Sequence, residues 1–239
     1  MLQLREHQQD VVEKLREGFK AGHRCQLLYA PTGFGKTEVA MAIMKAVAQK
    51  YKKCAMVLDR IVLVDQTSRR LTKYGIEHGV MQSGHWRYRP FEHIQICSAQ
   101  TLERREVFPE IDLLIIDECH ITRRGVVKFI KDNPQIKVIG LTATPFTKGL
   151  GDIYSHVVGA TPTGDLIDKG WLVPLKVYVD SPMALSATRI TLAHPDLLDA
   201  ETRELIMWQQ AHPDQMHIEF VADVDASKAL NAIRRGAVI

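Results

Sequence analysis

Two short segments of this sequence carry residues whose types and spacing suit phosphate chemistry. The first is APTGFGKT, residues 30–37, which follows an apolar run and precedes a stretch with helical apolar spacing. Gly33 and Gly35 can adopt positive φ angles and let the backbone approach phosphate oxygens without a Cβ in the way. Lys36 offers a mobile positive charge to the β- and γ-phosphates of a nucleotide, and the Thr37 hydroxyl can bind Mg²⁺. The segment therefore predicts a phosphate-binding loop. Because an alanine replaces the first glycine of the general pattern GxxxxGK[ST], a plain strand–turn–helix with an exposed lysine is the alternative.

The second segment is LLIIDECH, residues 113–120, in which an acidic pair follows four aliphatic residues. Such an apolar run indicates a strand that is buried on both faces. Two adjacent carboxylates at the end of a buried strand cost free energy unless their charge is compensated. Asp117 can hold Mg²⁺, and Glu118 can orient an attacking water. The alternative is a surface Asp-Glu turn with no chemical role.

Apolar runs predict the strands that would position these segments. They end at Tyr29, Leu58, Cys97, Ile116 and Leu141, and stretches with helical spacing follow the first two runs. In an open parallel sheet, binding residues lie just beyond the carboxyl ends of the strands. The sequence therefore predicts an α/β fold in which both segments emerge at one edge of a mostly parallel central sheet flanked by helices.

Further polar residues follow the other predicted strands. Arg60 comes after residues 54–58, and Gln100 and Thr101 come after residues 94–97. Two hydroxyls, Thr142 and Thr144, follow residues 137–141. A surface charge or an ordinary turn explains each of these equally well when it is taken alone.

Two segments outside this pattern leave their interpretation open. Residues 2–21 predict an amphipathic helix, near whose start the carboxamide of Gln8 could both accept from and donate to the edge of an adenine base. A solvated helix start explains Gln8 equally well. The loop MQSGHWRYRP, residues 81–90, mixes arginine with aromatics, which suits phosphate contact and base stacking. It suits equally a solvated connection whose Trp86 packs down on the sheet.

The composition fits an ordinary globular protein. The chain has 239 residues, of which 46% are apolar and 25% charged, and its net charge of +3 is too small to indicate a nucleic-acid partner by itself. Its four cysteines form no CxxC pair, so buried free thiols in a reducing, cytoplasmic compartment are expected. No apolar run reaches the length of a membrane span, and no membrane partner is expected. The oligomeric state is left open.

Together these motifs resemble superfamily 2 helicases. The segments LREHQ, APTGFGKT, Arg60–Gln66, SAQTL, DECH and LTATP occur in that family's order and spacing. Residues 2–179 resemble the first RecA-like domain of its DEAD/DEAH-like branch, a P-loop NTPase fold. DECH followed by GLTATPF is most similar to bacterial and phage DNA repair helicases and to the translocase subunits of type I and type III restriction enzymes.

The resemblance implies a role for each matching position. ATP and Mg²⁺ would be the cofactors, and DNA would be favoured over RNA because the similar proteins act on it. Glu118 and Lys36 would be catalytic, and Thr37 and Asp117 would hold the metal. Arg60, Gln100 and Thr101 would contact the nucleic-acid backbone. Thr142 and Thr144 would couple ATP hydrolysis to that contact. ATP itself would be bound by Arg5, Gln8, Thr32, Gly33, Phe34, Gly35, Lys36 and Thr37.

The resemblance also divides the chain. Residues 1–180 would form the ATP-binding domain, residues 181–214 a linker and helix, and residues 215–239 a truncated start of the second RecA-like domain. That second domain would act in cis and supply the arginines that stabilise the transferred phosphoryl, so the 239-residue chain is expected to hydrolyse ATP poorly. Two alternatives are a non-catalytic helicase-like fragment that binds nucleic acid or a protein partner, and a P-loop kinase or GTPase. The last would need a motif such as NKxD, which the sequence lacks.

Overall fold

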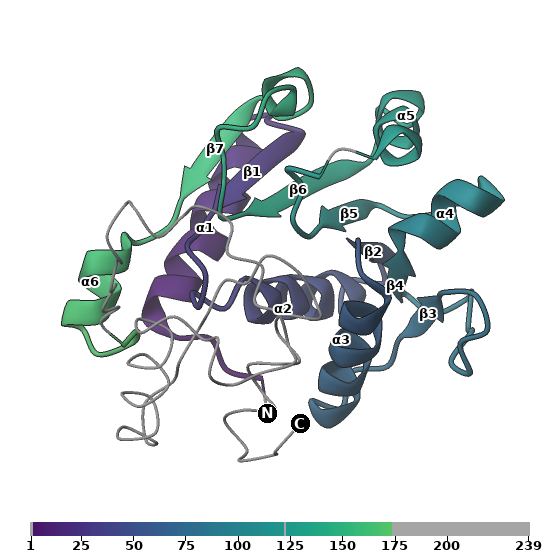
Figure 1. The fold of residues 1–239 in the computed structure, drawn as a ribbon, viewed down its shortest axis with the longest axis horizontal. Helices are drawn as coiled ribbons and strands as arrows, with labels where there is room; N and C mark the ends of the chain where they lie inside the picture. Colours follow the sequence, from purple (N-terminus) through teal and green to yellow (C-terminus); the bar gives the residue numbers. More distant parts are fainter. Residues whose placement is uncertain (1, 122, 174–239) are drawn as a thin grey trace, which may run out of the picture. The chain divides into compact units, whose positions relative to one another are not determined.

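The computed structural model describes residues 2–121 and 123–173 of the chain. These residues build a seven-stranded sheet in the order β3-β4-β2-β5-β6-β1-β7, with helices on both faces (Figure 1). Every strand pair in this sheet is parallel. The expected α/β fold with a parallel sheet is therefore confirmed. The predicted linker at 181–214 and the predicted domain start at 215–239 lie outside the described residues.

The elements alternate along the chain as the apolar runs predicted. The strands are β1 (Cys25–Tyr29), β2 (Cys54–Leu58), β3 (Gly79–Met81), β4 (Ile94–Ser98), β5 (Leu113–Ile116), β6 (Lys137–Thr142) and β7 (His156–Gly159). The helices are α1 (Glu6–Lys20), α2 (Lys36–Ala48), α3 (Ile61–Lys73), α4 (Ala99–Arg105), α5 (Arg124–Asp132), α6 (Thr163–Asp168) and the 3₁₀ helix η1 (Leu150–Asp152). The edge strands β3 and β7 and the helices α4 and α5 were not anticipated from the sequence.

A separate apolar core covers each face of the sheet. Side chains from α1, α2 and α3 pack on one face, and side chains from α4 and α5 pack on the other (Figure 1). Successive strand residues alternate between the two cores, as Leu27 and Leu28 of β1 do. This double burial explains why the central strands are continuous apolar runs with no polar face.

The parallel register brings five loops to one edge of the sheet. Tyr29 of β1 pairs with Thr142 of β6, and Leu58 of β2 pairs with Ser98 of β4. The strands β1 and β5 both pair with β6, so the phosphate loop and the DECH segment are separated by a single strand. The residues that follow β1, β2, β4, β5 and β6 therefore meet at the carboxyl edge of the sheet.

The structure also shows the state of the cysteines and the length of the helices. All four cysteines are free and buried, as the sequence predicted. Within residues 2–121 and 123–173, no helix is long and apolar enough to cross a membrane.

Gly140 in the central strand β6 allows a close approach of the Tyr154 ring. A Cβ added at Gly140 would lie 2.5 Å from ring and hydroxyl atoms of Tyr154, which is 6% exposed. We therefore expect Gly140→Ala to lower the free energy of unfolding by about 1–3 kcal/mol through overpacking. Urea denaturation followed by circular dichroism measures the change.

Gly151 supplies the matched control, because a Cβ there would meet no atom within 4 Å. Gly151→Ala should change the free energy of unfolding by no more than about 0.5 kcal/mol. Equal stability of the two variants would show that Tyr154 does not constrain β6.

Candidate functional site

The loop between β1 and α2 has the backbone conformation that phosphate binding needs. Gly33 and Gly35 have φ angles of 82° and 91°, which residues with a Cβ rarely adopt. Helix α2 begins directly afterwards at Lys36, so the unpaired N–H groups of its first turn face the loop. The amide of Ala30 donates to the carbonyl of Thr142 (3.0 Å), which ties the loop to the end of β6.

Lys36 lies folded over this loop. Its Nζ donates to the carbonyl oxygens of Ala30 (3.0 Å) and Pro31 (3.4 Å). The neighbouring Thr37 is half-buried in the first turn of α2, and Thr32 is exposed in the loop. Lys36 and Thr37 thus lie in the first turn of α2, directly after the loop.

Gln8 holds the start of α1 against the same loop. Its Nε2 donates to the carbonyl of Phe34 (2.9 Å), and its Oε1 accepts from the amide of Arg5 (3.0 Å). Gln8 is 5% exposed, and Phe34 is 1% exposed. The sequence predicted Gln8 as a base reader, whereas these contacts show that its amide also fixes the loop backbone.

An aromatic cluster adjoins Gln8. The guanidinium carbon of Arg5 lies 4.6 Å from the centroid of the Trp171 ring, and His7 packs edge-on against Phe34 at 5.0 Å. Burial, and then the charge of Arg5, lower the pKa of His7 below its ordinary value. His7 is therefore a neutral packing residue near neutral pH, a role that the sequence did not reveal.

The carboxylate pair is held by backbone contacts to both neighbouring strands. The amide of Asp117 donates to Val57 of β2 (3.0 Å), and the amide of Cys119 donates to Leu141 of β6 (3.0 Å). Glu118 has a φ angle of 47°, a left-handed conformation that costs free energy in a residue with a Cβ. The turn thus stores local strain at the point where the two carboxylates emerge.

Electrostatics link this pair to the phosphate loop. Burial raises the pKa of Asp117 above its ordinary value, the adjacent charge of Glu118 raises it further, and the charge of Lys36 opposes both. Lys36 and Asp117 are therefore close enough to interact across the carboxyl edge. A divalent cation between the loop and Asp117 would relieve the repulsion within the acidic pair, so the site suits Mg²⁺.

The protein donors alone would not make a complete metal cage. The described residues contain no group of three or more His, Cys, Asp or Glu side chains that could hold a metal. Mg²⁺ commonly binds through one or two protein oxygens together with substrate phosphates and waters. The oxygens of Thr37 and Asp117 fit that mode and do not fit a resident metal centre.

A chain of polar contacts joins Glu118 to the threonines after β6. His120 Nδ1 lies 3.3 Å from Glu118 Oε2 and 3.1 Å from Thr142 Oγ1. Thr142 Oγ1 accepts from the amide of Thr144 (2.9 Å) and lies 3.3 Å from Thr144 Oγ1. His120 is thus the link between the carboxylates and the threonines. The sequence gave it no role, although its place two residues after Glu118 was the available signal.

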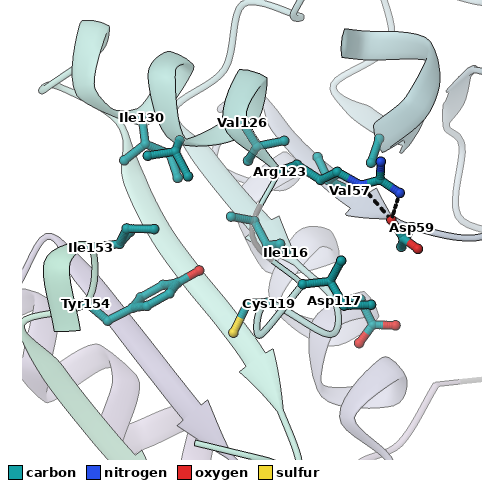
Figure 2. A pocket seen from close by; sticks show the side chains of 13 residues that line it. Val57, Asp59, Ile116, Asp117, Cys119, Arg123, Val126, Ile130, Ile153 and Tyr154 are labelled. Atoms are coloured by element: carbon teal, nitrogen blue, oxygen red, sulfur yellow. Dashed lines mark hydrogen bonds and ion pairs between the residues drawn. The ribbon is translucent and has the colours of Figure 1, made fainter. Parts of the chain in front are cut away.

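A small apolar cavity of about 20 Å³ lies beside Asp117 (Figure 2). Ile116, Cys119 and Tyr154 help to line it, and Asp117 stands at its rim with the carboxylate directed away from the apolar end. Its volume would admit one water at most, and its apolar lining offers that water few partners. The cavity is therefore a packing gap between β5 and α5.

Arg123 fixes the end of β2 beside this cavity (Figure 2). Its Nε donates to Asp59 Oδ1 (2.8 Å), and its Nη1 lies 3.5 Å from Glu103 Oε2. The hydrogen bond to Asp59 raises the pKa of Arg123 above its ordinary value. Arg123 therefore supports the backbone that carries Arg60, a role that no sequence motif signalled.

The three predicted nucleic-acid contacts follow the neighbouring strands β2 and β4. Arg60 and Gln100 are exposed, and Thr101 Oγ1 accepts from the amide of Ser83 at 3.4 Å. These residues share the carboxyl edge with the phosphate loop but occupy the other half of the sheet. The predicted ATP-site residues and the predicted nucleic-acid contacts thus lie in different halves of one sheet edge.

A family model described as "Type III restriction enzyme, res subunit" matches residues 1–147. The chain belongs to this family. Its first domain is therefore of the superfamily 2 helicase type, as the motifs predicted. A second model, described as a Beta-Casp domain, matches residues 164–239, of which the structure describes residues 164–173. No curated protein matches the chain.

Solved structures similar to this res-family chain support the fold. The UvsW helicase from bacteriophage T4 is 17% identical with a TM-score of 0.54, over 65% of this chain and 59% of UvsW. The ATP-dependent type ISP restriction-modification enzyme LlaBIII, solved bound to DNA, is 19% identical with a TM-score of 0.67, over 98% of this chain and 21% of LlaBIII. The chain therefore spans about three fifths of the first protein and one fifth of the second, and shares their RecA-like fold.

The raised pKa of Asp117 gives the res-family chain a testable pH dependence. The folded state holds this proton more tightly than the unfolded state, so the free energy of unfolding falls as the pH rises above the ordinary aspartate value of 3.8. Asp117→Asn removes this half-buried charge and keeps an oxygen acceptor at the position. We expect the variant to be more stable than wild type at pH 7 in metal-free buffer.

The difference in stability between the variant and wild type should narrow as the pH is lowered, and should level off below 3.8, where Asp117 is protonated in both the folded and the unfolded state. Urea denaturation at several pH values measures it. A variant less stable than wild type at neutral pH would contradict the charge account.

Proposed function

We propose that this chain is the ATP-binding part of an ATP-dependent nucleic-acid helicase or translocase that acts on DNA. The proposal is supported by two observations: the strands that precede Lys36 and the Asp117–Glu118 pair end at one edge of a parallel sheet, and the charge of Lys36 lowers the pKa of Asp117. A lysine at the mouth of a glycine loop and a carboxylate pair one strand away match what a triphosphate, its metal and an attacking water require.

ATP would bind along the start of α1 and the phosphate loop. Arg5 and Gln8 would contact the adenine, and residues 32–37 would hold the phosphates through backbone amides and Lys36. Thr37 and Asp117 would hold Mg²⁺, which when bound neutralises charge on the β- and γ-phosphates. Binding would draw Lys36 Nζ from the carbonyls of Ala30 and Pro31 onto phosphate oxygens.

Glu118 would orient the attacking water and accept its proton. The contact through His120 to Thr142 connects Glu118 with the threonines proposed to couple hydrolysis to DNA contact. Arg60, Gln100 and Thr101 would contact the backbone of one DNA strand. LlaBIII was solved bound to DNA, which supports this choice of substrate.

We further propose that rapid hydrolysis needs an arginine from a second RecA-like domain in cis. Such arginines contribute about 10³–10⁵ in rate in related NTPases. The 239-residue chain should therefore bind ATP and turn it over slowly by itself.

Buried free cysteines are consistent with a cytoplasmic protein.

Lys36→Ala tests the phosphate contact directly. We expect it to weaken binding of a fluorescent ATP analogue in Mg²⁺ buffer by about 10- to 100-fold, because a charged hydrogen-bond partner of the phosphates is lost. Fluorescence titration of the 239-residue chain measures the affinity. Lys50→Ala, an exposed lysine just beyond α2, is the control and should bind as wild type does.

Glu118→Gln separates binding from chemistry. This variant should retain affinity for the analogue while single-turnover hydrolysis of ATP slows by about 10²–10⁴-fold. Unchanged binding in Lys36→Ala, or unchanged hydrolysis in Glu118→Gln, would show that ATP is handled elsewhere.

A further inference from the structure

A surface groove of about 530 Å³ lies between α3 and the loop that follows β3. We call it the α3 groove. Arg69 and Asp65 line it from α3, and His85, Trp86 and Arg87 line it from the loop. Its volume is in the range of small-ligand sites. No residue of this groove belongs to the ATP site described above.

The loop wall of the groove is held in one conformation by a buried histidine. His85 Nδ1 accepts from the amide of Arg87 (3.0 Å), so His85 Nε2 carries the proton and donates it to Asp65 Oδ1 (3.0 Å). The His85 side chain is 5% exposed. The amide of Val80 donates to the carbonyl of Arg87 (2.9 Å). These contacts fasten the loop to both α3 and β3.

On this fixed loop, Trp86 points into solvent. Its side chain is 77% exposed, so the alternative in which Trp86 packs down on the sheet is wrong. The guanidinium carbon of Arg87 lies 4.8 Å from the centroid of the indole ring. An indole that is exposed and backed by a cation offers a flat surface on which another aromatic ring can stack.

The groove also offers unused positive charge. Arg87 is 9% exposed, and its Nε is buried without a hydrogen-bond partner among the described residues. Within the same residues, neither Arg69 nor Arg87 forms an ion pair. The one carboxylate in the groove, Asp65, already accepts from His85. The groove therefore suits a ligand that carries both an anion and an aromatic ring.

The α3 groove continues the surface proposed to contact DNA. Ser83, in the same loop, donates through its amide to Thr101 Oγ1 (3.4 Å). The loop leaves the carboxyl end of β3, which is the edge that also carries Arg60 and Thr101. A DNA strand lying along these two residues would reach the groove without turning away from the sheet edge.

We propose that the α3 groove holds an unpaired nucleotide of single-stranded DNA, with its base stacked on Trp86 and its phosphate on Arg69 and Arg87. This rests on the proposed function, since it presupposes a DNA strand on the carboxyl edge. Arg60, Gln100 and Thr101 are proposed to contact only the DNA backbone. The groove would add a contact to a base. Because every base has a flat face, such a contact does not depend on sequence.

Trp86→Ala tests the stacking contact. The wild-type chain and the variant are titrated into a fluorescein-labelled twelve-nucleotide oligo-dT at fixed salt, and fluorescence anisotropy gives the dissociation constants. We expect the variant to bind roughly 5- to 100-fold more weakly, the range for loss of one stacked base. Phe91→Ala is the matched control, because Phe91 is 93% exposed nearby but does not line the groove.

An abasic oligonucleotide of the same length isolates the base from the backbone. Wild type should lose affinity for it, and Trp86→Ala should lose little more, because the partner of the indole is already absent. Arg69→Ala should reduce the slope of log affinity against log salt by about one, whereas Lys73→Ala on the same helix should leave it unchanged.

Equal affinity of wild type and Trp86→Ala for oligo-dT would overturn the proposal and would indicate that the groove serves another partner, such as a protein. That result would leave the ATP site intact, because the Lys36→Ala titration reports on it separately. Absence of oligo-dT binding by wild type would also overturn the proposal. Binding of the ATP analogue in the same sample would then show that the phosphate loop is sound.

Discussion

The structure depends on one charge arrangement, in which a half-buried acidic pair and a lysine follow strands that are separated by a single strand. Asp117 emerges from a strand with no polar face, and its proton is held by burial and by the charge of Glu118. The charge of Lys36, and then a backbone hydrogen bond from Glu118, oppose this rise in the pKa. Ionised Asp117 lowers the free energy of unfolding. An apolar or amide side chain at position 117 would not. Strained or repelling groups of this kind gather where a protein binds or reacts.

A series of backbone and side-chain contacts connects this arrangement across the sheet edge. The side chain of Gln8 donates to the Phe34 carbonyl of the phosphate loop, and the amide of Ala30 donates to the carbonyl of Thr142. From Thr142 the path runs through His120 back to Glu118. A displacement of the loop by a bound triphosphate therefore has direct partners on β6 and in the DECH turn. This gives a physical route between the phosphate loop, the end of β6 and the carboxylate pair.

The sequence predicted the central strands and the shared edge because long apolar runs and parallel pairing determine both. It did not predict β3, which has three residues, or β7, which is partly exposed, since neither has a distinct apolar run. The position of His120 between Glu118 and Thr142 depends on the pairing of β5 with β6, which no local pattern states. The exposure of Trp86 depends likewise on the contact of His85 with Asp65 of α3. Gln8 was singled out for its chemistry, but its contact with Phe34 required the fold.

The most direct test of the central claim is a crystal structure of the chain grown with Mn²⁺ and a non-hydrolysable ATP analogue, with anomalous diffraction used to locate the metal. We predict a single strong anomalous peak between Thr37 Oγ1 and the Asp117 carboxylate, with the β- and γ-phosphates on Lys36 and a water beside Glu118. An analogue and metal bound away from the phosphate loop, with Lys36 Nζ still on the carbonyls of Ala30 and Pro31, would contradict it.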